Sequence, residues 1–72
     1  MTPARIKALQ WFHDRGEVDA LDFTPHSAAP TNKMCSIMMC EGQLCSREDS
    51  DGWRYWSLTD KGRQDLHDAT RR

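Results

Sequence analysis

The chain has 72 residues, of which 38% are hydrophobic and 29% are charged, and its formal net charge is −1. This length indicates a single domain near the lower limit for folding without disulfides or metals, and the composition excludes a disordered chain. No apolar run approaches the ~20 residues that span a bilayer, and the N-terminus lacks the order of a signal peptide. We therefore expect a cytoplasmic globular domain with no membrane partner.

The first predicted element is a helix that begins at Thr2-Pro3 and ends at Gly16. Threonine is a good N-cap, proline suits the first helical position, and glycine suits the left-handed residue after a helix. The face expected to be buried recurs at helical spacing and consists of Ile6, Ala8, Leu9, Trp11 and Phe12.

A short strand at residues 17–19 should follow, because polar and apolar residues alternate there. The next segment contains Pro25 and Pro30, which leave little room for a helix over residues 24–30. A second helix is therefore expected to be short, 3₁₀-like or replaced by a loop, from which Phe23 fills the core.

A further helix is predicted from the Thr31 cap to the Gly42 stop, with Met34 and Met38 one turn apart on its inner face. Its outward face is expected to carry Asn32, Lys33, Ser36 and Cys40.

An Asp51-Gly52 pair between alternating runs at residues 44–48 and 53–58 predicts a β-hairpin. In the return strand, Trp56 and Leu58 are expected to face the core, with Trp53 and Tyr55 partly exposed on the other face.

Thr59 and Asp60 have the residue types of a helix start, so a last helix is predicted. Its apolar anchors are Leu66 and Ala69, Gly62 would let its first turn lie close to the sheet, and its end is expected to fray.

Two passages resemble winged-helix regulators. Residues 38–47, MMCEGQLCSR, look like the passage from the recognition helix into the wing, which reads Leu-x-x-x-Gly-x-hydrophobic-x-x-Arg. Residues 56–63, WSLTDKGR, are similar to the passage out of the wing in MarR-like and PadR-like families. In its shortness the chain resembles the free-standing winged helices of phages and mobile elements, including excisionase-like proteins.

The resemblance implies an α+β winged helix over residues 1–72: helix, short strand, short or broken second helix, third helix, β-hairpin wing and C-terminal helix. It implies a DNA-binding transcriptional regulator whose third helix enters the major groove of double-stranded DNA. So small a monomer contacts few base pairs, so a homodimer or adjacent sites would be needed. The DNA-binding residues carried over are Asn32, Lys33 and Ser36 on the third helix and Arg47 and Arg54 on the wing.

A second hypothesis is a winged helix that binds and modulates a host protein without binding DNA. The charge is spread evenly along the chain, whereas DNA-binding domains usually have a basic face, and Glu48, Asp49 and Asp51 at the wing tip would repel phosphate. The alternative for the helix residues is an ordinary solvated face, and for the two wing arginines it is ion pairing with Glu48 or Asp49. Protein contact would fall to Met39, Trp53 and Tyr55.

Cys35, Cys40 and Cys45 with His13 or His26 have the residue types of zinc ligands, but their spacing is not that of a zinc knuckle. Three is an odd number, so a complete disulfide framework is excluded and reduced thiols are expected. We expect no metal and no cofactor. The sequence also has no nucleophile elbow, phosphate loop or paired carboxylates, so no enzymatic activity is expected.

Overall fold

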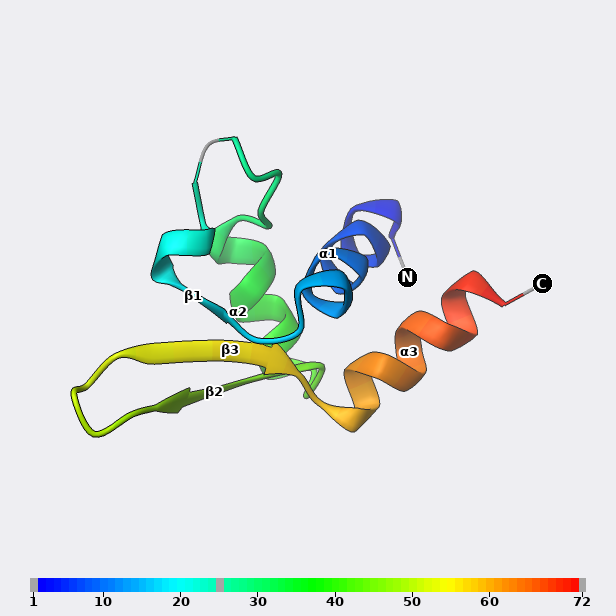
Figure 1. Ribbon diagram of the computed structural model, residues 1–72. Helices are drawn as coiled ribbons and strands as arrows, with labels where there is room; N and C mark the ends of the chain where they lie inside the picture. The colour runs from blue at the N-terminus through cyan, green and yellow to red at the C-terminus, as the bar shows by residue number, and fades with distance from the viewer. Residues whose placement is uncertain (1, 25, 72) are drawn as a thin grey trace.

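The computed structural model describes residues 2–24 and 26–71, and over these it is an α+β domain with three α-helices and a three-stranded antiparallel sheet (Figure 1). The strand order is β1-β3-β2, so β3 is central. The β2–β3 hairpin extends away from the helices, at the opposite end from the chain termini (Figure 1). The elements are α1 (Pro3–Arg15), β1 (Val18–Asp19), the 3₁₀ helix η1 (Ala20–Asp22), α2 (Asn32–Cys40), β2 (Leu44–Glu48), β3 (Arg54–Leu58) and α3 (Asp60–Thr70).

Helix α1 begins and ends where the sequence predicts. The Thr2 hydroxyl accepts a hydrogen bond from the backbone N–H of Arg5, Pro3 is the first helical residue, and Gly16 follows the helix with a φ of 79°. Its inner face is buried at Ala8, Leu9 and Phe12 and half-buried at Ile6 and Trp11, as expected.

The segment in which a second helix was expected to be short, 3₁₀-like or replaced by a loop contains η1 and a loop. Asp19 caps η1 by accepting from the N–H of Leu21, and the three-residue element ends before Phe23. The Phe23 ring lies 5.3 Å from that of Trp11 and 5.6 Å from that of Trp56, which confirms its predicted place against the core. The indole N–H of Trp11 also donates to the carbonyl of Ser27 at 2.9 Å. Ring contacts and this hydrogen bond therefore hold the segment against the core. Pro25 lies outside the described residues.

Helix α2 has the predicted cap, stop and faces. The Thr31 hydroxyl accepts from the N–H of Met34, Met38 is fully buried, and Gly42 follows the helix at a φ of 76°. The residues predicted to face outward are all exposed: Asn32, Lys33, Ser36 and Cys40.

The hairpin loop consists of Ser50, Asp51 and Gly52. The N–H of Gly52 donates to the carbonyl of Asp49, and Gly52 has a φ of 82°, as in a type I turn followed by a left-handed glycine. On β3, Leu58 is buried and Trp56 packs against the core, whereas Trp53, just before the strand, is exposed, so the predicted assignment of the two faces is confirmed. Tyr55 is half-buried.

The start of α3 packs against the residues that link α2 to β2. The N–H of Thr59 donates to the carbonyl of Gln43, and its hydroxyl donates to that of Gly42. Gly62 lies so close that a Cβ atom there would be 2.1 Å from the carbonyl oxygen of Gln43, which confirms the predicted close approach. The two passages that resemble winged-helix regulators therefore contact each other.

The end of α3 differs from the prediction. Leu66 is buried, but Ala69, one turn further on the same face, is exposed and does not belong to the core. The helix also continues to Thr70, whose hydroxyl donates to the carbonyl of Leu66, instead of fraying from Ala69 onward. Arg72 lies outside the described residues. No helix within residues 2–24 and 26–71 has the length and apolarity to span a membrane.

Candidate functional site

An apolar hollow of about 310 Å³ opens between η1, α2 and β3. This volume lies at the lower end of the range of ligand pockets, about 300–1,000 Å³. No charged residue lines it. The lining of this α2 hollow consists of Ala20 and Phe23 in and after η1, Asn32, Cys35, Ser36 and Met39 on α2, and Trp56 on β3.

The α2 residues of the hollow recur at helical spacing, so the helix presents them on one side. On the opposite wall the rings of Phe23 and Trp56 meet edge to face at an interplanar angle of 81°. Phe23 also packs on Trp11 and Phe12, which belong to or border the buried core. One wall of the hollow is therefore formed by side chains that pack against the core.

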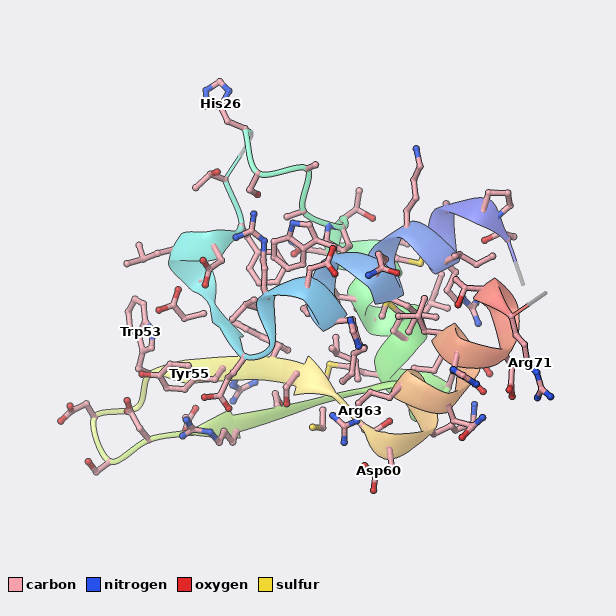
Figure 2. The ribbon with its side chains drawn as sticks, turned by 45° about the vertical axis from the view of Figure 1, so that its right-hand side comes forward. His26, Trp53, Tyr55, Asp60, Arg63 and Arg71 are labelled. Carbon is pink, nitrogen blue, oxygen red and sulfur yellow. The ribbon has the colours of Figure 1, made fainter. Side chains whose placement is uncertain are left out.

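Three large apolar side chains are exposed among the described residues: Leu21 is 72% exposed, Met39 42% and Trp53 41%. Met39 lines the α2 hollow, and Leu21 is the neighbour of Ala20, which lines it too. Trp53 projects from the end of the hairpin (Figure 2). Exposed apolar groups that adjoin a hollow are typical of an interaction surface.

Cys35 is half-buried in the wall of the α2 hollow, and burial raises the pKa of its thiol. It therefore stays protonated at neutral pH. Cys40 and Cys45 are exposed free thiols. Within the part of the chain that the structure describes, no three His, Cys, Asp or Glu side chains gather in a group that could hold a metal.

The two hairpin arginines project from opposite faces of the hairpin. In the β2–β3 register, Arg47 lies opposite Tyr55 and Arg54 lies opposite Glu48. These two cross-strand pairs are adjacent along the strands, so their side chains point to opposite faces of the hairpin. They cannot both face one phosphate backbone without a change in the hairpin. Arg54 forms the cross-strand ion pair with Glu48, at 3.0 Å, that was the alternative to phosphate binding.

Arg47 is held in place by Glu17, which precedes β1, and by Tyr55 on β3. Its guanidinium donates to both carboxylate oxygens of Glu17, at 2.8 and 2.6 Å, and lies 4.5 Å from the centre of the Tyr55 ring. Phosphate binding by Arg47 would therefore compete with a bidentate ion pair, the strongest type of such contact. Glu17 was not identified from the sequence, because the pair depends on the pairing of β1 with β3.

Tyr55 belongs to the internal structure of the hairpin. Its hydroxyl donates to Asp49 at 3.3 Å, and Arg47 covers its ring. Asp49 also accepts from the backbone N–H groups of Asp51 and Trp53, both at 2.9 Å. Of the three residues predicted for protein contact, Met39 and Trp53 are thus exposed, and Tyr55 supports the strand that carries Trp53.

On the elements that form the α2 hollow, carboxylates without a salt bridge outnumber cations without one among the described residues. On η1, α2, the hairpin and their immediate neighbours, Lys33 is the one cation that forms no salt bridge with another described residue. Five carboxylates there likewise form no salt bridge within the described residues: Asp19, Asp22, Glu41, Asp49 and Asp51. Asp19 and Asp49 lie on the Tyr55 face of β3, away from Trp56 and the hollow.

The pKa values of Glu17 and Asp49 provide a test of the contacts that these carboxyl groups make with the hairpin. Hydrogen bonds from Arg47 lower the pKa of Glu17 below its ordinary 4.5, and the backbone N–H of Trp53, aided by Asp51 and Tyr55, lowers that of Asp49 below 3.8. Since both pKa values are depressed on folding, their stabilising contribution is complete above the unfolded values and is lost as the pH falls through the folded ones. A carboxyl-detected NMR titration should show both depressions.

The matched variants for this titration are Arg47→Gln and Arg54→Gln. Arg47→Gln should return the pKa of Glu17 towards 4.5, because its main hydrogen-bond donor is lost. Arg54→Gln removes a charge from the opposite face and should leave the pKa of Glu17 unchanged. If the pKa of Glu17 is the same in Arg47→Gln as in the wild type, the ion pair between Glu17 and Arg47 is contradicted.

The α2 hollow was not predicted as a site from the sequence. The spacing of Asn32, Cys35, Ser36 and Met39 could have indicated a common face, but no local pattern predicts that Ala20 and Trp56 complete it.

In comparisons with known proteins, the chain matches no family model, no curated protein and no solved structure. Its function must therefore be argued from its own residues.

Proposed function

We propose that the chain is a winged helix that binds a partner protein through α2 and the hairpin, with the α2 hollow at the centre of the contact. The sheet order β1-β3-β2, with a helix before β1 and another before β2, fits this fold. Helix α2 then corresponds to the third helix, the hairpin to the wing, and η1 with its loop to the second helix. The same fold is compatible with phage or mobile-element proteins of the kind that the sequence resembles.

The observation that carries this proposal is the character of the surface between the third helix and the wing. A winged helix that binds DNA places phosphates near this surface and needs cations there. Here the surface is an uncharged, largely apolar hollow that is lined in part by exposed Met39, and Lys33 is the only cation on α2. Uncharged, partly aromatic centres with a polar rim are characteristic of protein interfaces.

DNA binding is the second candidate, and one observation favours it. Asn32, Lys33 and Ser36 are exposed on the first turns of α2, where side chains of a recognition helix contact bases. Lys33 would be the only cation of this helix, and both wing arginines would have to leave carboxylate partners. Little positive charge is therefore left free to attract the phosphates of DNA.

The two candidates are separated by binding to random duplex DNA at low and moderate salt. We expect no measurable binding by the wild-type chain in fluorescence anisotropy. A Glu17→Gln/Glu48→Gln variant frees Arg47 and Arg54 from their ion pairs. It should gain weak, salt-sensitive binding with a slope of about one in log affinity against log salt, because the two arginines face opposite sides of the hairpin. Tight wild-type binding at moderate salt, lost in Lys33→Ala, would establish the DNA role instead.

Protein binding is tested by selection from a random peptide display library on the immobilised wild-type domain. We expect enriched peptides that no longer bind Met39→Glu, because this change places a charge in the wall of the α2 hollow. Ala69→Glu adds the same charge on the exposed face of α3 and should retain binding. Circular dichroism checks that both variants fold. Failure to enrich any peptide, or equal binding to both variants, would contradict the proposal.

A further inference from the structure

We infer that residues 27–31 form a strap that Trp11 holds closed against α1, and that release of this strap widens a second hollow between α1 and α2. The inference goes beyond the proposed function, because it concerns a movement of the chain itself and requires no partner. It is carried by two observations: a strained backbone at Ala28, and a hydrogen bond that joins the strap to α1.

Ala28 has a strained backbone. Its φ of 59° lies in the left-handed region, and within residues 2–24 and 26–71 it is the one non-glycine residue with a positive φ. In this region the Cβ atom of an L-residue lies too close to the following carbonyl oxygen. Such strain persists only where the surrounding structure imposes it. The chain on both sides of Ala28 must therefore be fixed.

The strap is fixed at its first residue, Ser27. The N–H and the hydroxyl of Ser27 both donate to the carbonyl of Thr24, at 3.1 and 2.8 Å, which closes a turn before the strap. The carbonyl of Ser27 accepts from the indole N–H of Trp11 at 2.9 Å. Trp11 is itself held, because the Arg15 guanidinium lies 4.7 Å from the centre of its ring and the Phe23 ring lies 5.3 Å away.

The strap is also fixed at its last residue, where α2 begins. Pro30 confines the residue before it to an extended backbone, and the Thr31 hydroxyl caps α2 by accepting from the N–H of Met34. Ala28 lies in the turn between these two fixed ends. The strain therefore falls on Ala28.

One hydrogen bond opposes this strain. Among the described residues, the bond from Trp11 is the only hydrogen bond between the strap and α1, and the backbone groups of Ala28, Ala29 and Pro30 form none. The strain of a left-handed alanine and the net gain from one hydrogen bond are of similar size and opposite sign. Closure therefore depends on the packing of Ala29 and Pro30, which are only half-buried. A strap so weakly held opens locally, without unfolding of the domain.

The strap is one wall of a second hollow, which has a volume of about 280 Å³. Residues 28–31 form this wall, and the other walls are formed by Ala4, Lys7 and Ala8 on α1 and by Met34 on α2. Ala8 is buried and Met34 packs against the core. In Figure 2, His26 projects from the loop away from the helices, so the strap is the part of the loop that returns to α2. Release of the strap therefore widens this hollow and exposes apolar surface between the two helices.

The test follows the indole N–H of Trp11 in the whole chain by hydrogen exchange and NMR. Ala28→Gly should slow its exchange about three- to fivefold, because glycine adopts a positive φ without strain and so favours the closed strap. Ala29→Gly is the matched control. It relieves no left-handed strain and adds freedom to the released strap, so exchange should quicken about two- to fivefold. In the wild type the rate should change little at low urea, as expected for a local opening.

A thiol placed under the strap reports whether the hollow widens. Met34→Cys is combined with Cys35→Ser and Cys45→Ser, and the exposed Cys40 remains as an internal reference. Trp11→Phe keeps an aromatic ring but removes the hydrogen-bond donor, so it should raise the alkylation rate at residue 34 about two- to tenfold. The rate at Cys40 should stay unchanged, and circular dichroism checks folding.

Three results would overturn the inference. If exchange at Trp11 rises with urea as steeply as that of the slowest backbone amides, the strap opens only with the whole domain. If Ala28→Gly and Ala29→Gly have equal effects, no strain is held at Ala28. If Trp11→Phe folds and leaves the alkylation rate at residue 34 unchanged, the strap does not cover the hollow.

Two further comparisons keep the test decisive. If Trp11→Phe does not fold, the two glycine variants are compared at residue 34 instead, where Ala28→Gly should slow alkylation and Ala29→Gly should quicken it. None of these measurements uses a partner. Their failure would therefore leave the library selection with Met39→Glu, which tests the proposed function, unaffected.

Discussion

Gly62→Ala is expected to lower the free energy of unfolding by about 3 kcal/mol, a large part of the stability of so small a domain. The added Cβ would lie 2.1 Å from the carbonyl oxygen of Gln43, a backbone atom that is already fixed by the N–H of Thr59. Either α3 or the α2–β2 link must move. The midpoint of urea denaturation, followed by tryptophan fluorescence, measures the loss.

The sign of this effect is what makes the test informative. Gly62 is inside a helix, where alanine ordinarily stabilises by about 1 kcal/mol relative to glycine. Gly16→Ala is the matched control, because it has open space around the new Cβ and only the strain of its φ of 79°, about 1–2 kcal/mol. A stabilised Gly62→Ala variant would show that α3 does not pack on Gln43 as described.

Local signals in the sequence were sufficient for most of the fold. The caps Thr2, Thr31 and Thr59 act within one turn of the backbone, so residue type and spacing predict them. The Asp51-Gly52 turn and the alternation on β3 are equally local. Ala69 was misassigned because spacing places it on the same face as buried Leu66 but does not establish how far along α3 the core extends.

The candidate site depended on contacts between distant segments. The sequence predicted which α2 residues are exposed and that Met39 and Trp53 lie at the surface. It did not predict the Glu17–Arg47 pair, which joins residues 30 apart, or the hollow, which needs η1 beside α2 and β3. The residue type of Arg47 suits phosphate, so phosphate binding was predicted for it. In the folded chain its guanidinium instead pairs with the carboxylate of Glu17.

The aromatic cluster explains how the segment between β1 and α2 packs against the core without forming an α-helix. Trp11, Phe12, Phe23 and Trp56 pack ring to ring, and Trp11 also binds the loop carbonyl of Ser27. This cluster holds η1 and its loop against α1 and β3. Because Phe23 and Trp56 are at the same time walls of the α2 hollow, the part of the fold that departs from a regular second helix is the part that forms the candidate site.

Phe12→Ala is accordingly expected to cost about 3–5 kcal/mol and to leave little or no folded protein at room temperature. Phe12 is fully buried, its ring centre lies 5.0 Å from that of Trp11 and 6.1 Å from that of Phe23, and no neighbouring side chain can fill the space. Phe12→Leu keeps most of the volume and should lose much less. Circular dichroism and urea denaturation measure both variants.

A double-mutant cycle links this core position to the candidate site. Phe12→Leu and Phe23→Leu, alone and together, should show a coupling of about 0.5–1.5 kcal/mol, because the two rings contact each other directly. Phe23→Leu should also weaken peptide binding at the α2 hollow, whereas Leu66→Val, a core change on α3, should lower stability and leave binding unchanged. Additive effects of the two phenylalanine variants would mean that η1 is held in place by contacts other than this cluster.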